Sequence, residues 1–176
     1  MKLLLLLHYL VYRRSSNRDL IDADLNRWVE QHNIKKNAFI KAMSTYPAFR
    51  SLFYYRTPNS PFIRILRLLY PGEKTLRIFA KEIGPGLYIQ HGQNTTIGGY
   101  IGSGCWINQN CSMAYTKHGL PTIGDDVFIF LGSNIVGPVK IGDRVKVGAG
   151  TTVVKDIPSD CTVVSSENRI IPHRNR

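Results

Sequence analysis

Two histidine side chains have the chemistry for proton transfer near neutral pH. His91 lies between Gln90 and Gly92, and His118 lies farther along the chain. A neutral imidazole, with an unperturbed pKa of about 6.5, can remove a proton from a hydroxyl group, and the glycine after His91 lets a ligand approach the backbone. His91 is therefore the candidate general base. The alternative for either histidine is a solvent-facing polar side chain without a catalytic role.

Both histidines lie in a region where one hydrophobic side chain recurs every six residues. This period fits neither a helix nor an alternating strand and is typical of a parallel β-helix, whose blocks each form a short strand and a turn. Three blocks make a triangular coil of about eighteen residues, so residues 83–164 are predicted to form about four coils. The leading residues of the twelve blocks are Ile83, Ile89, Thr95, Ile101, Ile107, Met113, Ile123, Ile129, Ile135, Ile141, Val147 and Val153.

The residue four places after each leading residue is also expected to point into the coil. Two of the three cysteines occupy such positions, and three cysteines cannot all pair. We therefore expect core thiols in a reducing, cytoplasmic setting rather than disulfides. The inward positions are Gly99, Cys105, Cys111, Val127, Ser133, Val139, Val145 and Thr151.

The repeat is interrupted once, between Met113 and Ile123, where ten residues replace six. The four extra residues predict a loop over residues 115–122, which carries Tyr115 and His118. Loops on rigid scaffolds often carry function; a tolerated surface insertion is the alternative. Counting faces places His91 and His118 at different corners of the coil, so they would meet only if a neighbouring subunit supplied one of them.

Several stretches of the coil resemble serine acetyltransferase-like members of the hexapeptide acyltransferase superfamily. They are residues 84–92 (GPGLYIQHG), 101–109 (IGSGCWINQ), 121–127 (PTIGDDV) and 148–158 (GAGTTVVKDIP). The resemblance implies a left-handed parallel β-helix, a homotrimer, and acetyl-CoA bound along the groove between coils. It also implies that His91 is the general base of an O-acetyltransferase.

The same resemblance implies binding positions along the coil. The acceptor is expected near Gln90, Asn108, Gln109 and Tyr115, with His118 as a second catalytic histidine. No metal is expected: a zinc hydratase needs three imidazoles, and the coil has two histidines. A non-catalytic binding solenoid is a further alternative. The expected acetyl-CoA contacts are Gly132, Ser133, Gly148, Ala149 and Gly150, with Lys146 and Lys155 facing the phosphates.

The chain departs from the family pattern where serine acetyltransferases carry acids. The position before the base is Gln90 instead of Asp, and residues 76–79 (LRIF) hold no carboxylate. An ammonium group therefore has no evident counter-charge, which favours a neutral hydroxyl. The predicted acceptor is a saccharide of a capsular or surface polysaccharide or a glycoconjugate precursor, with serine as the alternative. His91 would be oriented by a main-chain carbonyl or by Glu82.

Residues 1–82 precede the repeats and are predicted to form an α-helical module, with helices near 19–33, 38–43 and 62–70. They hold 15 Lys/Arg against 6 Asp/Glu, whereas the whole chain has a net charge of +11. This suits an anionic membrane face or a solvated helical surface; no nucleic-acid motif is present. The apolar run in residues 1–14 is too short to cross a bilayer, so it predicts a packing helix, which could pair trimers, or a helix lying on the membrane. Residues 165–176 are predicted to be a tail.

Overall fold

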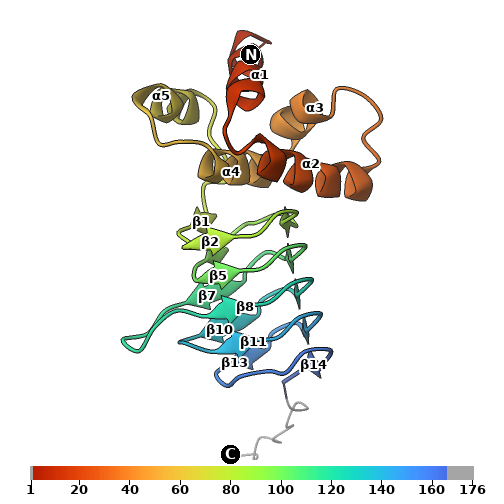
Figure 1. Cartoon of the computed structure of the whole chain (residues 1–176), viewed down its shortest axis with the longest axis vertical. Helices are drawn as coiled ribbons and strands as arrows, with labels where there is room; N and C mark the ends of the chain where they lie inside the picture. The colour runs from red at the N-terminus through yellow and green to blue at the C-terminus, as the bar shows by residue number, and fades with distance from the viewer. Residues whose placement is uncertain (1, 166–176) are drawn as a thin grey trace, which may run out of the picture.

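The computed structural model describes residues 2–165 and shows a helical module seated on one end of a β-helix (Figure 1). The predicted tail lies outside the described residues except for Ser165. The module agrees with the predicted helical segments and adds a helix rich in aromatics. Its helices are α1 (Lys2–Arg14), α2 (Arg18–His32), α3 (Ala38–Thr45), α4 (Pro47–Arg56) and α5 (Pro61–Leu69).

The coil consists of short strands that stack into three parallel sheets, which form the three sides of a prism. The first sheet has the order β1-β4-β7-β10-β13, the second β2-β5-β8-β11, and the third β3-β6-β9-β12-β14. The strands are β1 (Arg77–Ile78), β2 (Glu82–Ile83), β3 (Tyr88–Ile89), β4 (Thr96–Ile97), β5 (Tyr100–Ile101), β6 (Trp106–Ile107), β7 (Ser112–Ala114), β8 (Thr122–Ile123), β9 (Phe128–Ile129), β10 (Asn134–Val136), β11 (Lys140–Ile141), β12 (Lys146–Val147), β13 (Thr152–Val153) and β14 (Thr162–Val163).

This is the predicted left-handed parallel β-helix, but it has about five turns rather than four. The additional strand is β1, whose Arg77 and Ile78 pair with Thr96 and Ile97 of β4. The hexapeptide pattern did not reveal β1 because Ile78 is only five residues before Ile83. Strand pairing therefore begins at Arg77, six residues before the start of the predicted repeat.

The interior of the coil is built as expected from stacked leading residues. Ile83 pairs in register with Ile101, and Ile123 with Ile141. The inward positions four residues later are also buried, including Cys105 and Cys111, and burial raises the pKa of the Cys105 thiol to about 12. These cysteines are neutral core side chains. The predicted loop leaves the prism between β7 and β8 and is closed by a bridge between Thr116 and Gly119.

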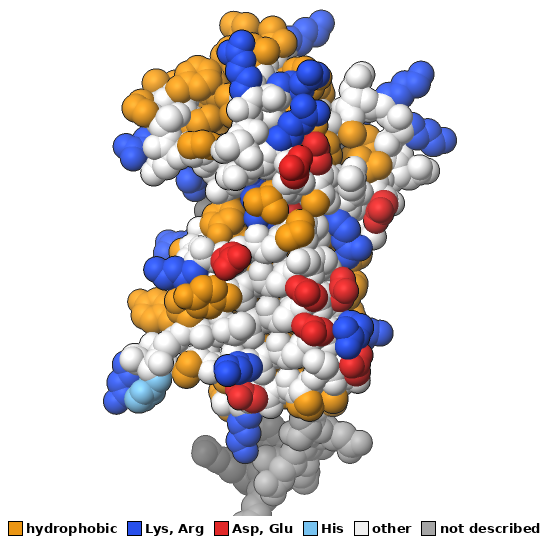
Figure 2. Space-filling view, in the orientation of Figure 1, with side chains coloured by type: hydrophobic (Ala, Val, Ile, Leu, Met, Phe, Trp, Pro, Cys, Tyr) orange, Lys and Arg blue, Asp and Glu red, His pale blue; other side chains and the backbone are white. Residues whose placement is uncertain are grey.

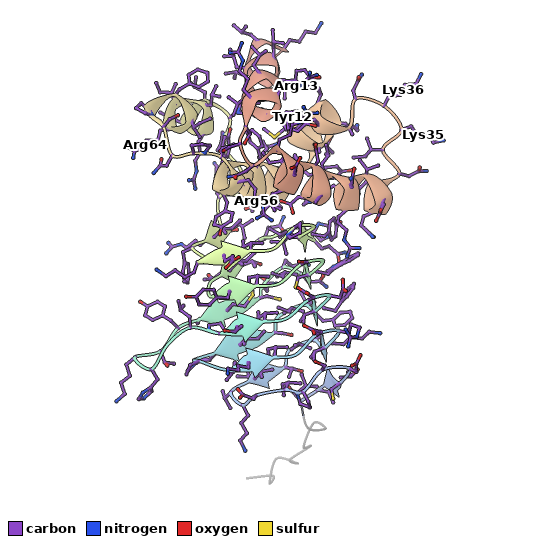
Figure 3. The ribbon with its side chains drawn as sticks, in the orientation of Figure 1. Tyr12, Arg13, Lys35, Lys36, Arg56 and Arg64 are labelled. Carbon is purple, nitrogen blue, oxygen red and sulfur yellow. The ribbon has the colours of Figure 1, made fainter. Side chains whose placement is uncertain are left out.

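A buried ion pair fixes the helical module to the coil. Asp24 of α2 accepts hydrogen bonds from Arg56 of α4 at 2.8 and 3.1 Å and from the Leu87 backbone N–H at 2.9 Å. Arg56 donates in turn to the carbonyls of Ile83 and Gly84, and it lies at the junction of module and coil (Figure 3). Asp24 is thus a buried carboxylate with a hydrogen-bond partner at both of its oxygens. Burial raises its pKa, and Arg56 opposes that shift.

Helix α1 is anchored by His8, which is fully buried. Its Nδ1 donates to the Leu4 carbonyl at 2.5 Å, and its Nε2 lies 2.6 Å from the Tyr54 hydroxyl of α4. Burial lowers the pKa of His8 below its usual value of 6.5. Among residues 2–165, no helix is both long and apolar enough to cross a membrane.

The lowered pKa of His8 predicts a loss of stability in mild acid. The unfolded chain binds a proton on His8 more readily than the folded chain does. The contribution of neutral His8 to the free energy of unfolding is therefore complete above about pH 6.5 and is lost as the pH falls through the pKa of the folded state. We expect the urea midpoint of the full chain to be lower at about pH 5 than at about pH 7.5. A His8→Gln variant should show a smaller decrease, and an equal decrease in both proteins would contradict this role.

Candidate active site

The turn that carries His91 is longer than the repeat predicts. Thr95 does not lead a block: it takes the small inward position, and Ile97 leads the strand, with both side chains fully buried. Eight residues therefore separate Ile89 from Ile97, and only four separate Ile97 from Ile101. The two extra residues enlarge the turn, so that His91 projects from the prism.

The backbone of this turn is held in an unusual conformation. His91 has φ +66° and Gly92 has φ +76°, in the left-handed region that costs an L-residue of order 1–3 kcal/mol. A Cβ on Gly92 would come within 3.1 Å of Ala48 Cβ and 3.3 Å of Leu76 Cδ2, so glycine lets α4 lie against the turn. The exposed His91 is thus presented by a locally strained, closely packed support.

His91 borders a cavity of about 220 Å³ between the coil and the module. The turn contributes Gln90, His91 and Gln93, β3 contributes Tyr88, and the helices contribute the rest. Among the residues that the structure describes, no carboxylate lines this cavity. Its remaining lining residues are Trp28, His32, Thr45, Tyr46, Pro47 and Ala48.

His32, at the end of α2, is the second imidazole of this cavity. Its Nε2 lies 3.0 Å from the Tyr88 hydroxyl, and its ring stacks on Tyr46 at 4.1 Å. Burial and the nearby His91 both lower the pKa of His32, and burial raises the pKa of Tyr88. These shifts favour neutral forms, so the cavity holds imidazole and phenol groups that can exchange hydrogen bonds with a neutral acceptor.

Gln90 is held by the outer face of the third sheet. The indole N–H of Trp106 donates to Gln90 Oε1 at 3.2 Å and to Asn108 Oδ1 at 2.7 Å. Trp106 contacts Tyr88 edge-on and stacks on Phe128, with ring centroids 4.5 and 4.7 Å apart. Two of the predicted acceptor-binding residues, Gln90 and Asn108, are therefore joined through one indole next to the cavity.

The corner between the third and first sheets, here called the His91 corner, also carries most of the predicted acetyl-CoA positions. Gly132 and Gly150 stack here in left-handed turns, at φ +71° and +67°. Their N–H groups bond to Gln109 and Leu131 carbonyls of the preceding coil. Within residues 2–165 the N–H groups of Gln109, Leu131 and Ala149 have no partner. The corner thus offers a line of open backbone donors below His91.

The side chain of Ser133 is turned away from the His91 corner, so only its backbone could contact a ligand there. Its side chain is fully buried and its Oγ donates to the Gly148 carbonyl at 2.8 Å. It is a core residue that closes the coil, as its inward position in the repeat already indicated. Gly148 and Ala149 remain at the His91 corner, and Lys146 points outward from β12 beside Phe128 of β9.

Four other predicted residues lie away from His91 within one chain. Glu82 is exposed on β2 in the second sheet, so it does not orient His91. Lys155 follows β13 and sits with the loop at the corner between the first and second sheets. His118 and Tyr115 occupy that corner too, where Tyr115 meets Phe79 edge-on at 6.4 Å. His91 and His118 are at different corners, as the face count predicted.

No role was predicted for His32, Tyr88 or Trp106. Tyr88 and Trp106 are eighteen residues apart, and each directly precedes a leading residue. The repeat could therefore have predicted an aromatic pair on the outside of one sheet. His32 carried no such signal, because its position depends on how α2 docks. Among residues 2–165, no three His, Cys, Asp or Glu side chains gather as a metal site.

Comparisons with known proteins agree with this fold. Residues 121–155 match the bacterial transferase hexapeptide (six repeats) family. A serine acetyltransferase of Synechococcus elongatus is 30% identical over 75% of this chain and 60% of its own length. One from Helicobacter pylori is 27% identical over 84% of this chain and 94% of its own.

Solved structures agree in fold. The Neisseria gonorrhoeae serine acetyltransferase in complex with serine superposes with a TM-score of 0.68 and 21% identity, over 85% of this chain and 67% of that one. Isoform 3 from Entamoeba histolytica, in complex with cysteine, gives 0.69 and 22%, over 91% and 62%. Residues 121–155 therefore carry the hexapeptide repeat of bacterial transferases, and the chain is similar in sequence and in fold to serine acetyltransferases.

Proposed function

We propose that this chain transfers an acetyl group from acetyl-CoA to a hydroxyl group of a small acceptor, with His91 as the general base. The observation that carries the proposal is the position of His91. It lies between a cavity without carboxylates on one side and the glycine-lined His91 corner on the other. The relatives named above support the same reaction class.

The proposal gives each group around His91 a simple role. The imidazole takes the proton of the acceptor hydroxyl as its oxygen attacks the thioester carbonyl; the carbon–sulfur bond then breaks, and the proton passes to the departing thiolate. Because the acceptor and the thioester would be held on either side of the His91 imidazole, their proximity would also increase the rate. The open N–H groups of Gln109 and Leu131 are the proposed donors to the thioester oxygen or the pantetheine chain.

The acetyl-CoA groove is proposed to follow the His91 corner. Its glycines leave the backbone uncovered at Gly132 and Gly150, and the Ala149 N–H is open within residues 2–165. Lys146 is the proposed phosphate contact, since it projects from the adjacent sheet. Lys155 and His118 lie at another corner, so they would reach this groove only from a neighbouring subunit of a trimer, which stays a prediction.

Serine is the acceptor that the relatives favour, because they are named serine acetyltransferases; none of those reported above supports the predicted saccharide. A neutral hydroxyl acceptor, such as a saccharide, is kept as a second candidate for one reason. No carboxylate lines the cavity beside His91, so the ammonium group of serine would lack a counter-charge there.

A thiol-release assay tests both levels of the proposal. Purified full-length chain is incubated with acetyl-CoA and either L-serine or a panel of neutral mono- and oligosaccharides. We expect acceptor-dependent thiol release, and its absence with every acceptor would overturn the transferase. Faster release with serine would reject the saccharide. Gln90→Asp supplies the missing carboxylate, so it should lower the KM for serine and leave that for a neutral sugar largely unchanged.

A further inference from the structure

We propose that α1 and α5 form a docking face for an anionic membrane surface. The inference goes beyond the proposed acetyl transfer and does not depend on the acceptor. The docking face is defined by the exposed large hydrophobic side chains of these two helices. They are Leu3, Leu6 and Leu10 of α1 and Phe62, Ile65, Leu68 and Leu69 of α5, each between 42% and 81% exposed.

The space between the two helices is lined by apolar side chains together with Arg14 and three serines, and Leu10 and Phe62 of the docking face border it. A groove of about 630 Å³ lies between α1 and α5, lined by Leu7, Leu10 and Val11 on one side and Phe62 and Ile63 on the other. The groove joins the two exposed helix faces. Soluble proteins rarely leave contiguous apolar surface of this kind uncovered unless it binds something.

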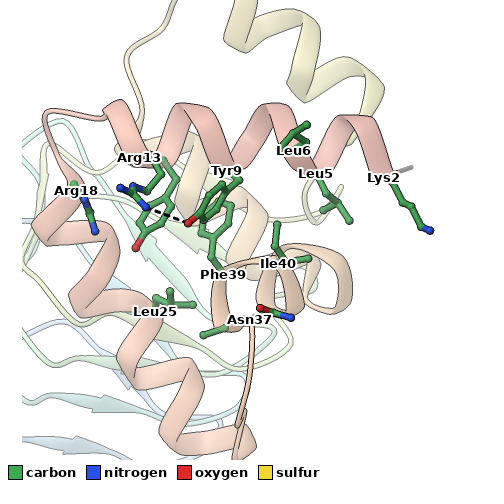
Figure 4. Close-up of a pocket in the computed structure, with 12 residues that line it drawn as sticks. Lys2, Leu5, Leu6, Tyr9, Arg13, Arg18, Leu25, Asn37, Phe39 and Ile40 are labelled. Atoms are coloured by element: carbon green, nitrogen blue, oxygen red, sulfur yellow. Dashed lines mark hydrogen bonds between the residues drawn. The ribbon is translucent and has the colours of Figure 1, made fainter.

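The other side of α1 is also open. A second hollow, of about 590 Å³, is lined by apolar side chains of α1 and α3, including Leu5, Leu6 and Phe39, with Lys2 and Arg13 at its edge (Figure 4). Helix α1 thus stands above the module with apolar hollows along both flanks. One face of α1 packs on the module through Leu5, His8 and Tyr12, and its exposed leucines are left to contact a bilayer interface.

The positive charge of α1 and α5 favours an anionic binding partner for the docking face. The two helices carry Lys2, Arg13, Arg14, Arg64 and Arg67, all exposed, and their sequences contain no acidic residue. Basic side chains bordering apolar ones are what an anionic lipid surface attracts. A second copy of the same face would set these five cations against five identical cations, because a twofold interface pairs each patch with itself.

The whole molecule is polarised in the same direction. Residues 2–82 hold 15 Lys/Arg against 6 Asp/Glu, whereas residues 83–165 hold five of each. Basic side chains crowd the helical end, and the acidic ones seen in this view lie at the level of α2 and over the coil (Figure 2). An anionic surface would therefore turn the helical end toward itself and leave the coil pointing away (Figure 1). In any cyclic trimer the three docking faces would lie at one height along the axis.

Vesicle co-sedimentation of the full chain tests the proposal. Phosphatidylcholine vesicles with about a third phosphatidylglycerol should bind the chain at physiological ionic strength and release it at about 1 M salt, and vesicles of phosphatidylcholine alone should bind little. Two variants address the two contributions: Ile65→Ser with Leu68→Ser, and Arg64→Gln with Arg67→Gln. Each pair should weaken binding by roughly tenfold or more, since the side chains are exposed and would contact lipid.

Matched controls come from the coil. Val154→Ser with Val164→Ser removes apolar side chains that are 62% and 67% exposed, and Lys117→Gln with Lys140→Gln removes two exposed charges; both should bind as the wild type does. Failure of the wild type to bind anionic vesicles, or equal weakening by the control pairs, would overturn the proposal. A smaller assembly in light scattering for the α5 apolar variant, with no vesicle binding by wild type, would instead make the face an interface between copies.

Discussion

His91→Asn is expected to lower kcat for acetyl transfer by about 10²–10⁴-fold, the usual contribution of a positioned general base. Asparagine is the sharper choice than alanine, because His91 has φ +66° and asparagine accepts the left-handed region. The variant should keep the turn and lose only the proton acceptor. Thiol release with saturating acetyl-CoA and acceptor measures the effect.

The control is a histidine at the other corner. His118→Asn alters an exposed loop histidine that lies outside the His91 cavity of its own chain, so its effect on kcat should be smaller unless a neighbouring subunit brings it to the site. The far-UV spectrum and the urea midpoint of both variants should match the wild type. A His91→Asn protein that keeps near-normal kcat would remove His91 from the role of base, whatever the acceptor.

Asp24→Asn is expected to lower the free energy of unfolding by about 3–5 kcal/mol, the range for breaking a buried ion pair by removing one partner. The variant leaves Arg56 charged with side-chain exposure of only 3%. It also weakens the contact between α2 and the Leu87 N–H on the first coil. Urea denaturation followed by tryptophan fluorescence reports the change, since Trp28 is buried in α2.

A surface pair gives the matched control. Arg144 and Asp160 bond at 2.6 Å, but both side chains are more than half exposed, so Asp160→Asn should change the unfolding free energy far less. Replacing both buried partners, as Asp24→Leu with Arg56→Met, should recover part of the loss because no unpaired charge remains. An Asp24→Asn protein as stable as the Asp160→Asn protein would show that the pair does not hold the module.

The coil was predictable because its information is local and repeated. The position of a residue within its block predicts whether its side chain points inward. Ile83, Ile101 and Cys105 could therefore be placed in the core without knowledge of their tertiary contacts. The prediction was wrong where the period changes, at Thr95 and at Ile78. In both places the pairing of strands sets the register instead of the count of residues.

The candidate site was only half predictable for the same reason. His91 and Gln90 lie on the coil, and the repeat placed them at a corner. His32 reaches the same cavity only because Asp24 and Arg56 dock α2 onto the first turn, a tertiary contact that no periodicity encodes. The cavity therefore belongs to the contact between module and coil, whereas the sequence described the two parts separately.

The His91 turn gains two residues and the next side of the prism loses two, so Ile89 and Ile107 remain eighteen residues apart and still pair. The shortened side is possible because Gly99 has φ +89° and passes so close to the Pro121 carbonyl that a Cβ would collide with it. The longer His91 turn is thus compensated within the same turn of the β-helix, and the strands that follow stay in register. Redesigning the acceptor opening by lengthening residues 90–95 would call for an equal shortening nearby, and few positions other than glycine-rich ones can accommodate it.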